Sequence, residues 1–275
     1  MAIGQEQRYR PSSSTSARNA LRRLASKVYR GGYLRFYGTA DVHTHIRWRA
    51  IRPLLSSALP AGTALVLDVG CGVGSLSFEI ARRYTASSVL GVDVDPRNIE
   101  IANAVNEKIK CRNLAFRELS AIGLADISDS YCDAALLIDV VEHVIDHRSV
   151  AREVGRVLKP GGAVIISVPT PNYPRVFGRE FHNQIGHVRD GYWMPEIKEL
   201  FAEAGIRIEE YKYYTHPASS LACFLYYRWL RKVFYATIPA SPLLNLISYL
   251  DYLWPIRGPK YACAIALRGR KDVAQ

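Results

Sequence analysis

The stretch "LDVGCGVGS" at residues 67–75 constrains the fold of this chain more than any other segment. It continues an apolar run that contains Asp68, and its glycines stand at every second position, at Gly70, Gly72 and Gly74, with Cys71 between the first two. Glycines at a turn from a strand into a helix let the backbone approach a ligand closely, at the carboxyl end of a parallel sheet. The segment therefore predicts a cofactor site on a strand-turn-helix unit.

The surrounding sequence alternates short apolar runs with amphipathic stretches, the pattern of a parallel sheet flanked by helices. Strands are predicted at 64–69, 88–94, 114–119, 132–138 and 163–169, and helices at 75–84, 96–109 and 147–158. A further helix at 194–205 precedes two more strands, at 206–214 and 261–270. We therefore predict a doubly wound α/β fold.

The last two predicted strands are too far apart for a hairpin loop, so an insertion is expected between them. We divide the chain into a disordered leader (1–16), basic N-terminal helices (17–60), a cofactor-binding core (61–215), a helical aromatic and basic insertion (216–260), and the last strand with its tail (261–275).

Two further motifs accompany the glycine loop. The second predicted strand ends in "GVDVD", where Asp93 can accept both hydroxyls of a ribose, and the later segments "VEHV" and "RVLKPGG" flank a predicted helix. Together, over about residues 45–215, these motifs resemble the class I S-adenosylmethionine-dependent methyltransferases. The resemblance implies a seven-stranded, mostly parallel, Rossmann-like sheet and S-adenosylmethionine as the cofactor.

The resemblance also implies roles for individual residues. The loop from Asp68 to Gly74 embraces the methionyl and ribose parts of the cofactor, Asp93 binds the ribose hydroxyls and Val94 lies against adenine. Asp139 faces the methionine end, and Arg47 or Arg49 meets its carboxylate. Members of the family often carry an acidic residue after the third strand for the adenine amino group; here the turn reads "ELSAIG", so Glu118 or Ser120 is expected to substitute.

A sulfonium methyl group is already electrophilic, so the protein must mainly align a nucleophile with it. For a hydroxyl acceptor a base must also take a proton, a role that suits histidine at neutral pH. His143 and His187 are our candidates, and His182 is a weaker one. The pairs His43/His45 and His143/His147 have metal-like spacing, but no third ligand is evident, and we predict no metal.

The net charge of +11 is concentrated at the ends of the chain: residues 1–60 hold eleven Lys/Arg against two Asp/Glu, and residues 201–275 hold ten against five. The segments 18–30 and 221–235 combine cations with apolar or aromatic side chains, which suits helices lying on an anionic membrane surface. They could instead pack together as a lid over the acceptor pocket. Stacking on nucleic acid is less favoured, because the aromatic residues lie among Leu, Ile and Phe.

Localisation follows from three features of the sequence. The five cysteines are odd in number and form no C-x-x-C pair, which favours a reducing compartment. No apolar signal segment is visible at the N-terminus, and the weakly charged stretch 233–250 is interrupted by Pro239, Pro242 and Asn245. We predict a cytoplasmic protein that contacts the membrane peripherally.

Taken together, the sequence predicts an S-adenosylmethionine-dependent methyltransferase that acts on a small-molecule or lipid-like, lipid-linked acceptor at oxygen. The alternatives are an RNA methyltransferase and a non-catalytic cofactor-binding membrane scaffold. The oligomeric state is left open.

Overall fold

The computed structural model describes residues 42–59, 62–228, 234–253 and 258–273. The predicted leader and the basic helix at 18–30 lie outside the described residues.

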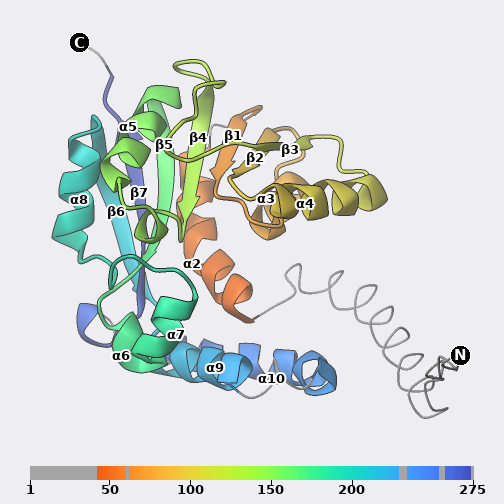
Figure 1. Ribbon diagram of the computed structural model, residues 1–275, viewed down its shortest axis with the longest axis vertical. Coiled ribbons are helices and arrows are strands. Elements are labelled where there is room, and N and C mark those ends of the chain that lie inside the picture. The colour runs from red at the N-terminus through yellow and green to blue at the C-terminus, as the bar shows by residue number, and fades with distance from the viewer. Residues whose placement is uncertain (1–41, 60–61, 229–233, 254–257, 274–275) are drawn as a thin grey trace, which may run out of the picture.

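A seven-stranded sheet with the order β3-β2-β1-β4-β5-β7-β6 forms the centre of the fold (Figure 1). Its strands are β1 (Leu65–Val69), β2 (Ser88–Asp93), β3 (Leu114–Glu118), β4 (Cys132–Ile138), β5 (Leu158–Pro169), β6 (Ile206–Tyr214) and β7 (Ala264–Lys271). The first five run parallel, and β7 runs antiparallel to both β5 and β6. The predicted doubly wound, mostly parallel fold is confirmed.

Helices cover both faces of the sheet, which is why the central strands are apolar on both sides. Val66 and Leu136 belong to one hydrophobic core with α2 (Val42–Ala58), α3 (Ser75–Arg83) and α4 (Pro96–Ile109). Their strand neighbours Leu67 and Leu137 belong to the opposite core with α5 (His147–Val157) and α8 (Met194–Ala202). The alternation follows from the two-residue period of a strand.

Local signals set where these helices begin. Asp95 caps α4, its side chain accepting a hydrogen bond from the Arg97 amide, and Pro96 occupies the first turn. Asp146 caps α5 in the same way through the Ser149 amide. Two predicted strand starts were wrong. β5 begins at Leu158 rather than at 163, because Leu158 already pairs with Cys132 before an irregularity in the register. β7 begins at Ala264 rather than at 261, because residues Pro259–Tyr261 form a 3-10 helix.

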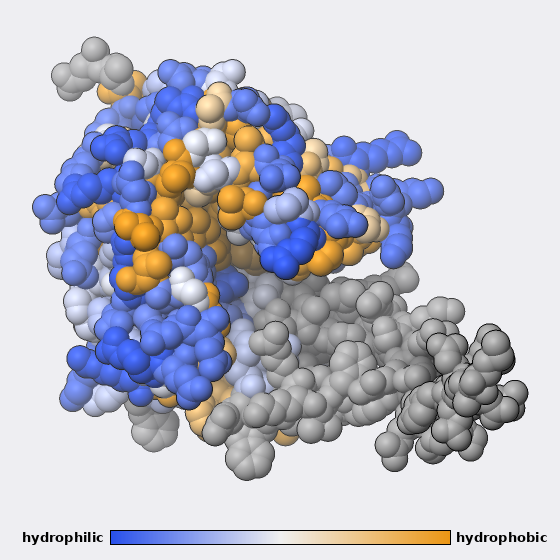
Figure 2. All heavy atoms as spheres, viewed as in Figure 1, coloured by the Kyte–Doolittle hydropathy of each residue, from blue (hydrophilic) through white to orange (hydrophobic). Residues whose placement is uncertain are grey.

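The strand order reverses between β1 and β4, so a crevice opens at the carboxyl ends of these strands. At this end of the sheet lie the short 3-10 helix η1 (Val141–His143) and the helices α6 (Tyr173–Phe177) and α7 (Arg179–Gln184). Figure 2 shows that hydrophilic residues cover most margins of the described face, while apolar residues gather toward its middle.

The described residues between β6 and β7 are largely helical, as predicted. It contains α9 (Pro217–Arg228), α10 (Phe234–Leu253) and the 3-10 helix η3 (Pro259–Tyr261). The carboxylate of Asp251 on α10 accepts hydrogen bonds from the amides of Ala218 and Ser219, at 2.9 and 3.0 Å, and so binds the first turn of α9. Within the described part of the chain, no helix is both long enough and apolar enough to cross a membrane.

The packing of α5 gives a stability prediction. A Cβ atom at Gly155 would lie 2.6 Å from the carbonyl oxygen of Ala204, which follows α8. Gly155→Ala should therefore lower the free energy of unfolding by about 1–3 kcal/mol, although alanine normally stabilises a helix by about 1 kcal/mol over glycine. Chemical denaturation measures the difference. Arg152→Ala on the exposed face of α5 is the control, expected within about 0.5 kcal/mol of the parent; a stabilised Gly155→Ala variant would contradict the packing.

Candidate cofactor and acceptor site

The glycine loop after β1 is tied to the end of β2. The amides of Gly70 and Cys71 both donate to the carbonyl of Val92, at 2.7 and 2.9 Å. The Gly72 amide donates to the Asp93 carboxylate at 2.8 Å. The φ angles of Gly70, Gly72 and Gly74 are +73°, +55° and +81°, a region that favours glycine. The loop therefore holds its curved shape through bonds within the protein.

The three glycines are needed for different reasons. A Cβ atom at Gly70 would lie 2.5 Å from Val140, and one at Gly74 would lie 2.5 Å from Phe116. A Cβ atom at Gly72 would meet nothing within 4 Å. Gly70 and Gly74 thus allow close packing inside the protein, and Gly72 is the glycine of the loop that borders open space.

Asp93 has a fixed orientation beside this loop. Its second carboxylate oxygen accepts hydrogen bonds from the Asp95 amide at 2.9 Å and from the Asn98 side chain at 3.1 Å. A carboxylate has about four lone-pair sites and these three bonds use three of them, so acceptor capacity remains for about one further donor from the ribose. The next residue, Val94, is 67% exposed and offers an apolar surface for a flat base. This arrangement fits the nucleoside part of S-adenosylmethionine.

The predicted partners of adenine lie near the same sheet edge. Glu118, at the end of β3, pairs in register with Asp93 and is exposed. Ser120 follows in a turn closed by a bridge to Gly123. Which of the two contacts adenine stays a prediction.

Asp68 and Cys71 flank the start of the glycine loop, and burial raises the pKa of both side chains. The buried Asp68 carboxyl accepts a hydrogen bond of 2.5 Å from Ser77 on α3, and burial raises its pKa to about 6. Burial, followed by the charges of Asp68 and Asp93, raises the pKa of the Cys71 thiol. Cys71 is therefore a neutral thiol at neutral pH.

Arg47 and Asp139 form an ion pair between α2 and the end of β4. Ser167 on β5 donates a hydrogen bond of 3.0 Å to the same carboxylate. Burial opposes ionisation of Asp139, but the charges of Arg47 and His43 and the hydrogen bonds from Ser167 and Arg47 together outweigh it and lower the pKa. Asp139 has a φ of +54°, which is uncommon for a residue other than glycine and accompanies functional sites.

The structure distinguishes the two arginines that the sequence offered. Arg49 turns away from Asp139: it donates to Ser248 on α10 and lies 4.1 Å from the ring centroid of Tyr249. Of the two, Arg47 is therefore the candidate for the methionine end.

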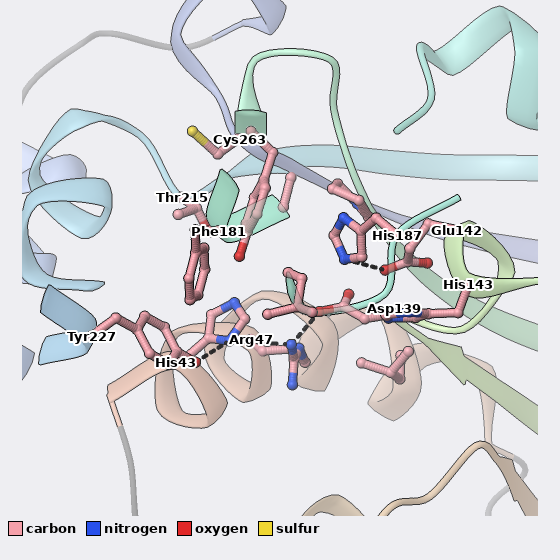
Figure 3. Close-up of a pocket in the computed structure, with 15 residues that line it drawn as sticks. His43, Arg47, Asp139, Glu142, His143, Phe181, His187, Thr215, Tyr227 and Cys263 are labelled. Atoms are coloured by element: carbon pink, nitrogen blue, oxygen red, sulfur yellow. Dashed lines mark hydrogen bonds and ion pairs between the residues drawn. The ribbon is translucent and has the colours of Figure 1, made fainter. Parts of the chain in front are cut away.

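The ion pair borders a cavity of about 360 Å³ (Figure 3). Its walls come from α2, the end of β4, η1, α6, α7 and α9, so segments far apart in the sequence build it. The lining residues are His43, Arg47, Ile138, Asp139, Glu142, His143, Pro169, Tyr173, Phe181, Ile185, His187, Thr215, Tyr227, Cys263 and Ala264.

The two predicted catalytic histidines meet at this cavity, with ring centroids 4.7 Å apart. His143 Nδ1 lies 3.1 Å from the carbonyl oxygen of Gly186. A carbonyl can only accept, so Nδ1 carries the proton and the Nε2 lone pair is left open. The His187 side chain is buried, and burial, followed by the charges of His143 and His182, lowers its pKa to about 4. His187 is therefore a neutral imidazole at physiological pH.

Two other histidines considered in the sequence have different surroundings. His182 is buried, and its Nε2 donates to the carbonyl of Arg189 at 3.0 Å, a structural bond beside the cavity. His147 is bonded to Tyr192 and Arg189 rather than to the ring of His143.

Sequence reasoning missed Glu142 as a functional residue. It stands in "VEHV", which served as a family signature, and its adjacency to His143 was the available signal. The side chain is fully buried, and neither carboxylate oxygen has a hydrogen-bond partner. Burial, and after it the charge of Asp139, raises the pKa of Glu142 well above its usual value. The aromatic wall of Tyr173, Phe181 and Tyr227 was also missed, because it assembles only in the fold.

Comparisons with known proteins agree with this geometry. Residues 67–166 match the family described as a methyltransferase domain. The ubiquinone biosynthesis O-methyltransferase of Leptothrix cholodnii is 35% identical over 112 residues, which are 41% of this chain and 46% of that protein. The match thus spans less than half of the relative's length.

Solved structures share the fold over most of this chain. Phosphoethanolamine N-methyltransferase 2 of Haemonchus contortus, solved in complex with S-adenosyl-L-methionine, has a TM-score of 0.58 and 19% identity, covering 82% of this chain and 53% of that chain. The 4+2 cyclase SpnF has a TM-score of 0.56 and 21% identity, covering 82% and 81%. Because one neighbour is a cyclase, the fold alone does not specify a reaction.

The fold and the site together define the class I S-adenosylmethionine-dependent methyltransferases. Residues 67–166 of this chain match the methyltransferase domain family, and proteins of that class use S-adenosylmethionine as their cofactor.

The raised pKa of Asp68 gives a pH-dependent prediction. Its folded-state pKa of about 6 lies above the ordinary value of 3.8, so its contribution to stability is full below pH 3.8 and is lost as the pH rises through 6. Asp68→Asn keeps an acceptor for Ser77 and removes the buried charge. It should raise the free energy of unfolding by up to about 3 kcal/mol at pH 8, with a much smaller gain near pH 4.5. Urea unfolding of both proteins at the two pH values measures this; an equal effect at both would contradict the assignment.

Proposed function

We propose that this protein is an S-adenosylmethionine-dependent O-methyltransferase whose acceptor is a small, largely apolar molecule carrying a hydroxyl group. The observation that carries the proposal is the cavity of about 360 Å³ beside the Arg47–Asp139 ion pair, with neutral imidazole at one wall and aromatic rings at another. The relative in Leptothrix cholodnii is a ubiquinone biosynthesis O-methyltransferase, which supports oxygen as the methylated atom.

The residues around the loop suit the cofactor. Gly72 leaves space for it, Asp93 accepts from a ribose hydroxyl and Val94 covers one face of adenine. At the methionine end, Arg47 faces the carboxylate and Asp139 the ammonium group, which matches the charges of an amino acid. When bound, S-adenosylmethionine supplies an electrophilic methyl group on its sulfonium.

The residues around the cavity suit the acceptor. Tyr173, Phe181 and Tyr227 contact its apolar part and remove that part from water. His143 takes the hydroxyl proton on Nε2, since its Nδ1 is already donating to Gly186. The deprotonated oxygen would then be placed to accept the methyl group that bound S-adenosylmethionine supplies.

Substitution of Gly72 tests the cofactor assignment. In Gly72→Val the new side chain enters the space assigned to the cofactor, and the affinity for S-adenosylmethionine should fall by at least 100-fold in isothermal titration calorimetry.

Gly205→Val is the matched control. Gly205 also has a positive φ, of +70°, and open space around its Cβ position, so the backbone strain is comparable. It should weaken binding less than threefold. Equal affinities of the Gly72→Val variant and the parent would show that the cofactor lies elsewhere.

We further propose that α10 contacts an anionic membrane surface. Leu243, Leu246, Leu250 and Leu253 recur at helical spacing along α10 and are between 50% and 80% exposed. An exposed cation lies beside this helix: Lys212 is 5.0 Å from the centroid of the Tyr252 ring. Exposed leucines with flanking tyrosines and cations are typical of interfacial helices, and such a position would bring the cavity near a lipid-like acceptor.

Introducing negative charges into the apolar stripe tests this contact. Leu246→Glu/Leu250→Glu should reduce the bound fraction on phosphatidylserine-containing vesicles at least tenfold in a flotation assay, because a fully buried leucine contributes about 1.5–3 kcal/mol. Ile101→Glu/Ile109→Glu on α4 places the same charges at two other exposed apolar positions and should float like the parent. Flotation of the α10 variant at the level of the parent would contradict the proposal.

A further inference from the structure

Glu142 has an environment that the methyl-transfer geometry leaves unexplained. Its side chain is completely buried, and both carboxylate oxygens lack a hydrogen-bond partner. The imidazole of His187 is close to this carboxylate, but its Nε2 lies 4.0 Å from Oε1, beyond hydrogen-bond reach. A buried carboxylate normally has partners that compensate for the loss of water. The missing partner points to a group that enters from outside.

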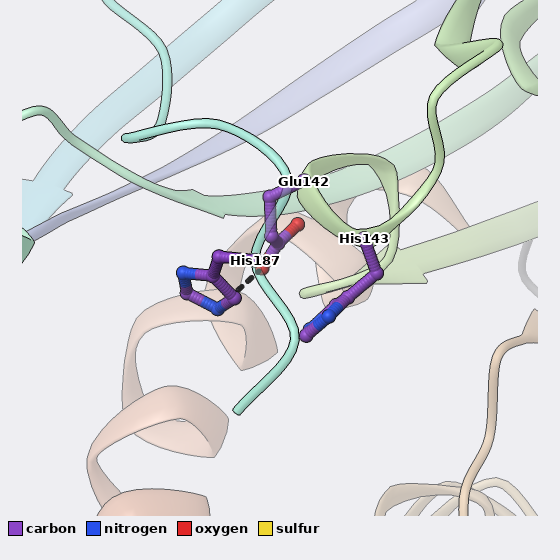
Figure 4. A group of neighbouring side chains, drawn as sticks. All are labelled: Glu142, His143 and His187. Atoms are coloured by element: carbon purple, nitrogen blue, oxygen red, sulfur yellow. Dashed lines mark ion pairs between the residues drawn. The ribbon is translucent and has the colours of Figure 1, made fainter. Parts of the chain in front are cut away.

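Two imidazoles stand beside this carboxylate (Figure 4). One ligand atom from each of Glu142, His143 and His187 lies within 4.8 Å of the others. His187 Nδ1 is buried without a hydrogen-bond partner. His143 donates from Nδ1 to the Gly186 carbonyl, which is the contact that fixes the tautomer and orientation of metal-binding histidines.

We propose that Glu142, His143 and His187 bind one divalent transition-metal ion at the edge of the acceptor cavity. Two imidazoles with one carboxylate suit zinc, manganese, iron or cobalt, whereas magnesium and calcium prefer oxygen ligands. Asp139 is the nearby carboxylate that could have supplied further oxygen ligands, but Arg47 and Ser167 already hold it. The donor set of the site is therefore two nitrogens and one carboxylate.

The geometry requires only a local closure. Ligand atoms about 2.1 Å from one ion lie about 3.0–3.4 Å apart, so the 4.0 Å separation of Glu142 and His187 must shorten by less than about 1 Å. The three ligand atoms lie within 4.8 Å of one another, so the widest separation must shorten by up to about 1.8 Å, through movement of His143 on the exposed side of the group.

The remaining coordination positions of the ion face the cavity that Glu142, His143 and His187 line. With an ion bound, His143 Nε2 would be a ligand and would no longer be available as the base. An acceptor hydroxyl on the ion would instead be more acidic than in water, would be held at a fixed position and would release its proton to solvent. This role rests on the proposed O-methyltransferase function; the existence of the metal site does not.

Metal binding is tested on the full chain, freed of metal with a chelator and without cofactor or acceptor. Zn²⁺, Mn²⁺ and Mg²⁺ are titrated separately, and bound metal is counted by elemental analysis. We expect one Zn²⁺ or Mn²⁺ per chain, and an increase in the unfolding midpoint of about 5 °C at a hundredfold excess over the dissociation constant. Mg²⁺ should bind at least 100-fold more weakly.

Glu142→Gln separates ligation from folding. Because the substitution removes a buried carboxylate without partners, the metal-free variant should unfold at a higher temperature than the metal-free parent, yet lose the increase that Zn²⁺ or Mn²⁺ produces. His143→Ala should weaken metal binding at least 100-fold. Glu118→Gln, an exposed glutamate at the end of β3, is the control and should bind metal like the parent.

Three results would overturn the proposal: no metal bound by the parent, Mg²⁺ preferred over Zn²⁺ and Mn²⁺, or an unchanged metal affinity in Glu142→Gln. Titration of the same metal-free protein with S-adenosylmethionine reports on the proposed function separately. A protein that binds the cofactor but no metal loses only the metal site, and one that binds metal but no cofactor loses only the proposed methyl transfer.

Discussion

The Arg47–Asp139 ion pair joins the parts of the molecule on which the site depends. Arg47 belongs to α2, and Asp139 ends β4 at the point where the strand order reverses. The left-handed backbone of Asp139 turns the chain into η1, which carries Glu142 and His143. Loss of either partner would leave a charge with little exposure and no counter-ion, a change that costs several kcal/mol. The pair therefore supports both halves of the site, the cofactor end and the acceptor cavity.

Much of the fold could be predicted because local periodicity encodes it. The α4 segment 96–109 and the β4 segment 132–138 have the predicted bounds, since caps, turns and apolar spacing act within a few residues. The reason for Gly74 could not be predicted, because Phe116, which would meet its Cβ, comes from another strand. In the same way, Arg47 and Arg49 are two residues apart on one helix, and only the tertiary packing shows that they point to different partners.

The candidate site was predictable only where a motif is continuous. Asp93 lies beside the glycine loop as expected, because consecutive parallel strands end at the same edge. Glu142 and His187 are distant in sequence, and the segment after α7 brings them together. The spacing of histidines along the chain therefore carried no information about a third ligand. A cluster formed by loops becomes visible only when the sheet and its covering helices are in place.

The hydrogen bonds from Asp251 to the start of α9 have a mechanical consequence. These bonds join the first turn of α9 to the last turns of α10. The far end of α9 carries Tyr227, which bonds His43 at the cavity wall. The last turns of α10 are thus connected to the wall of the acceptor cavity through α9, by hydrogen bonds at its two ends.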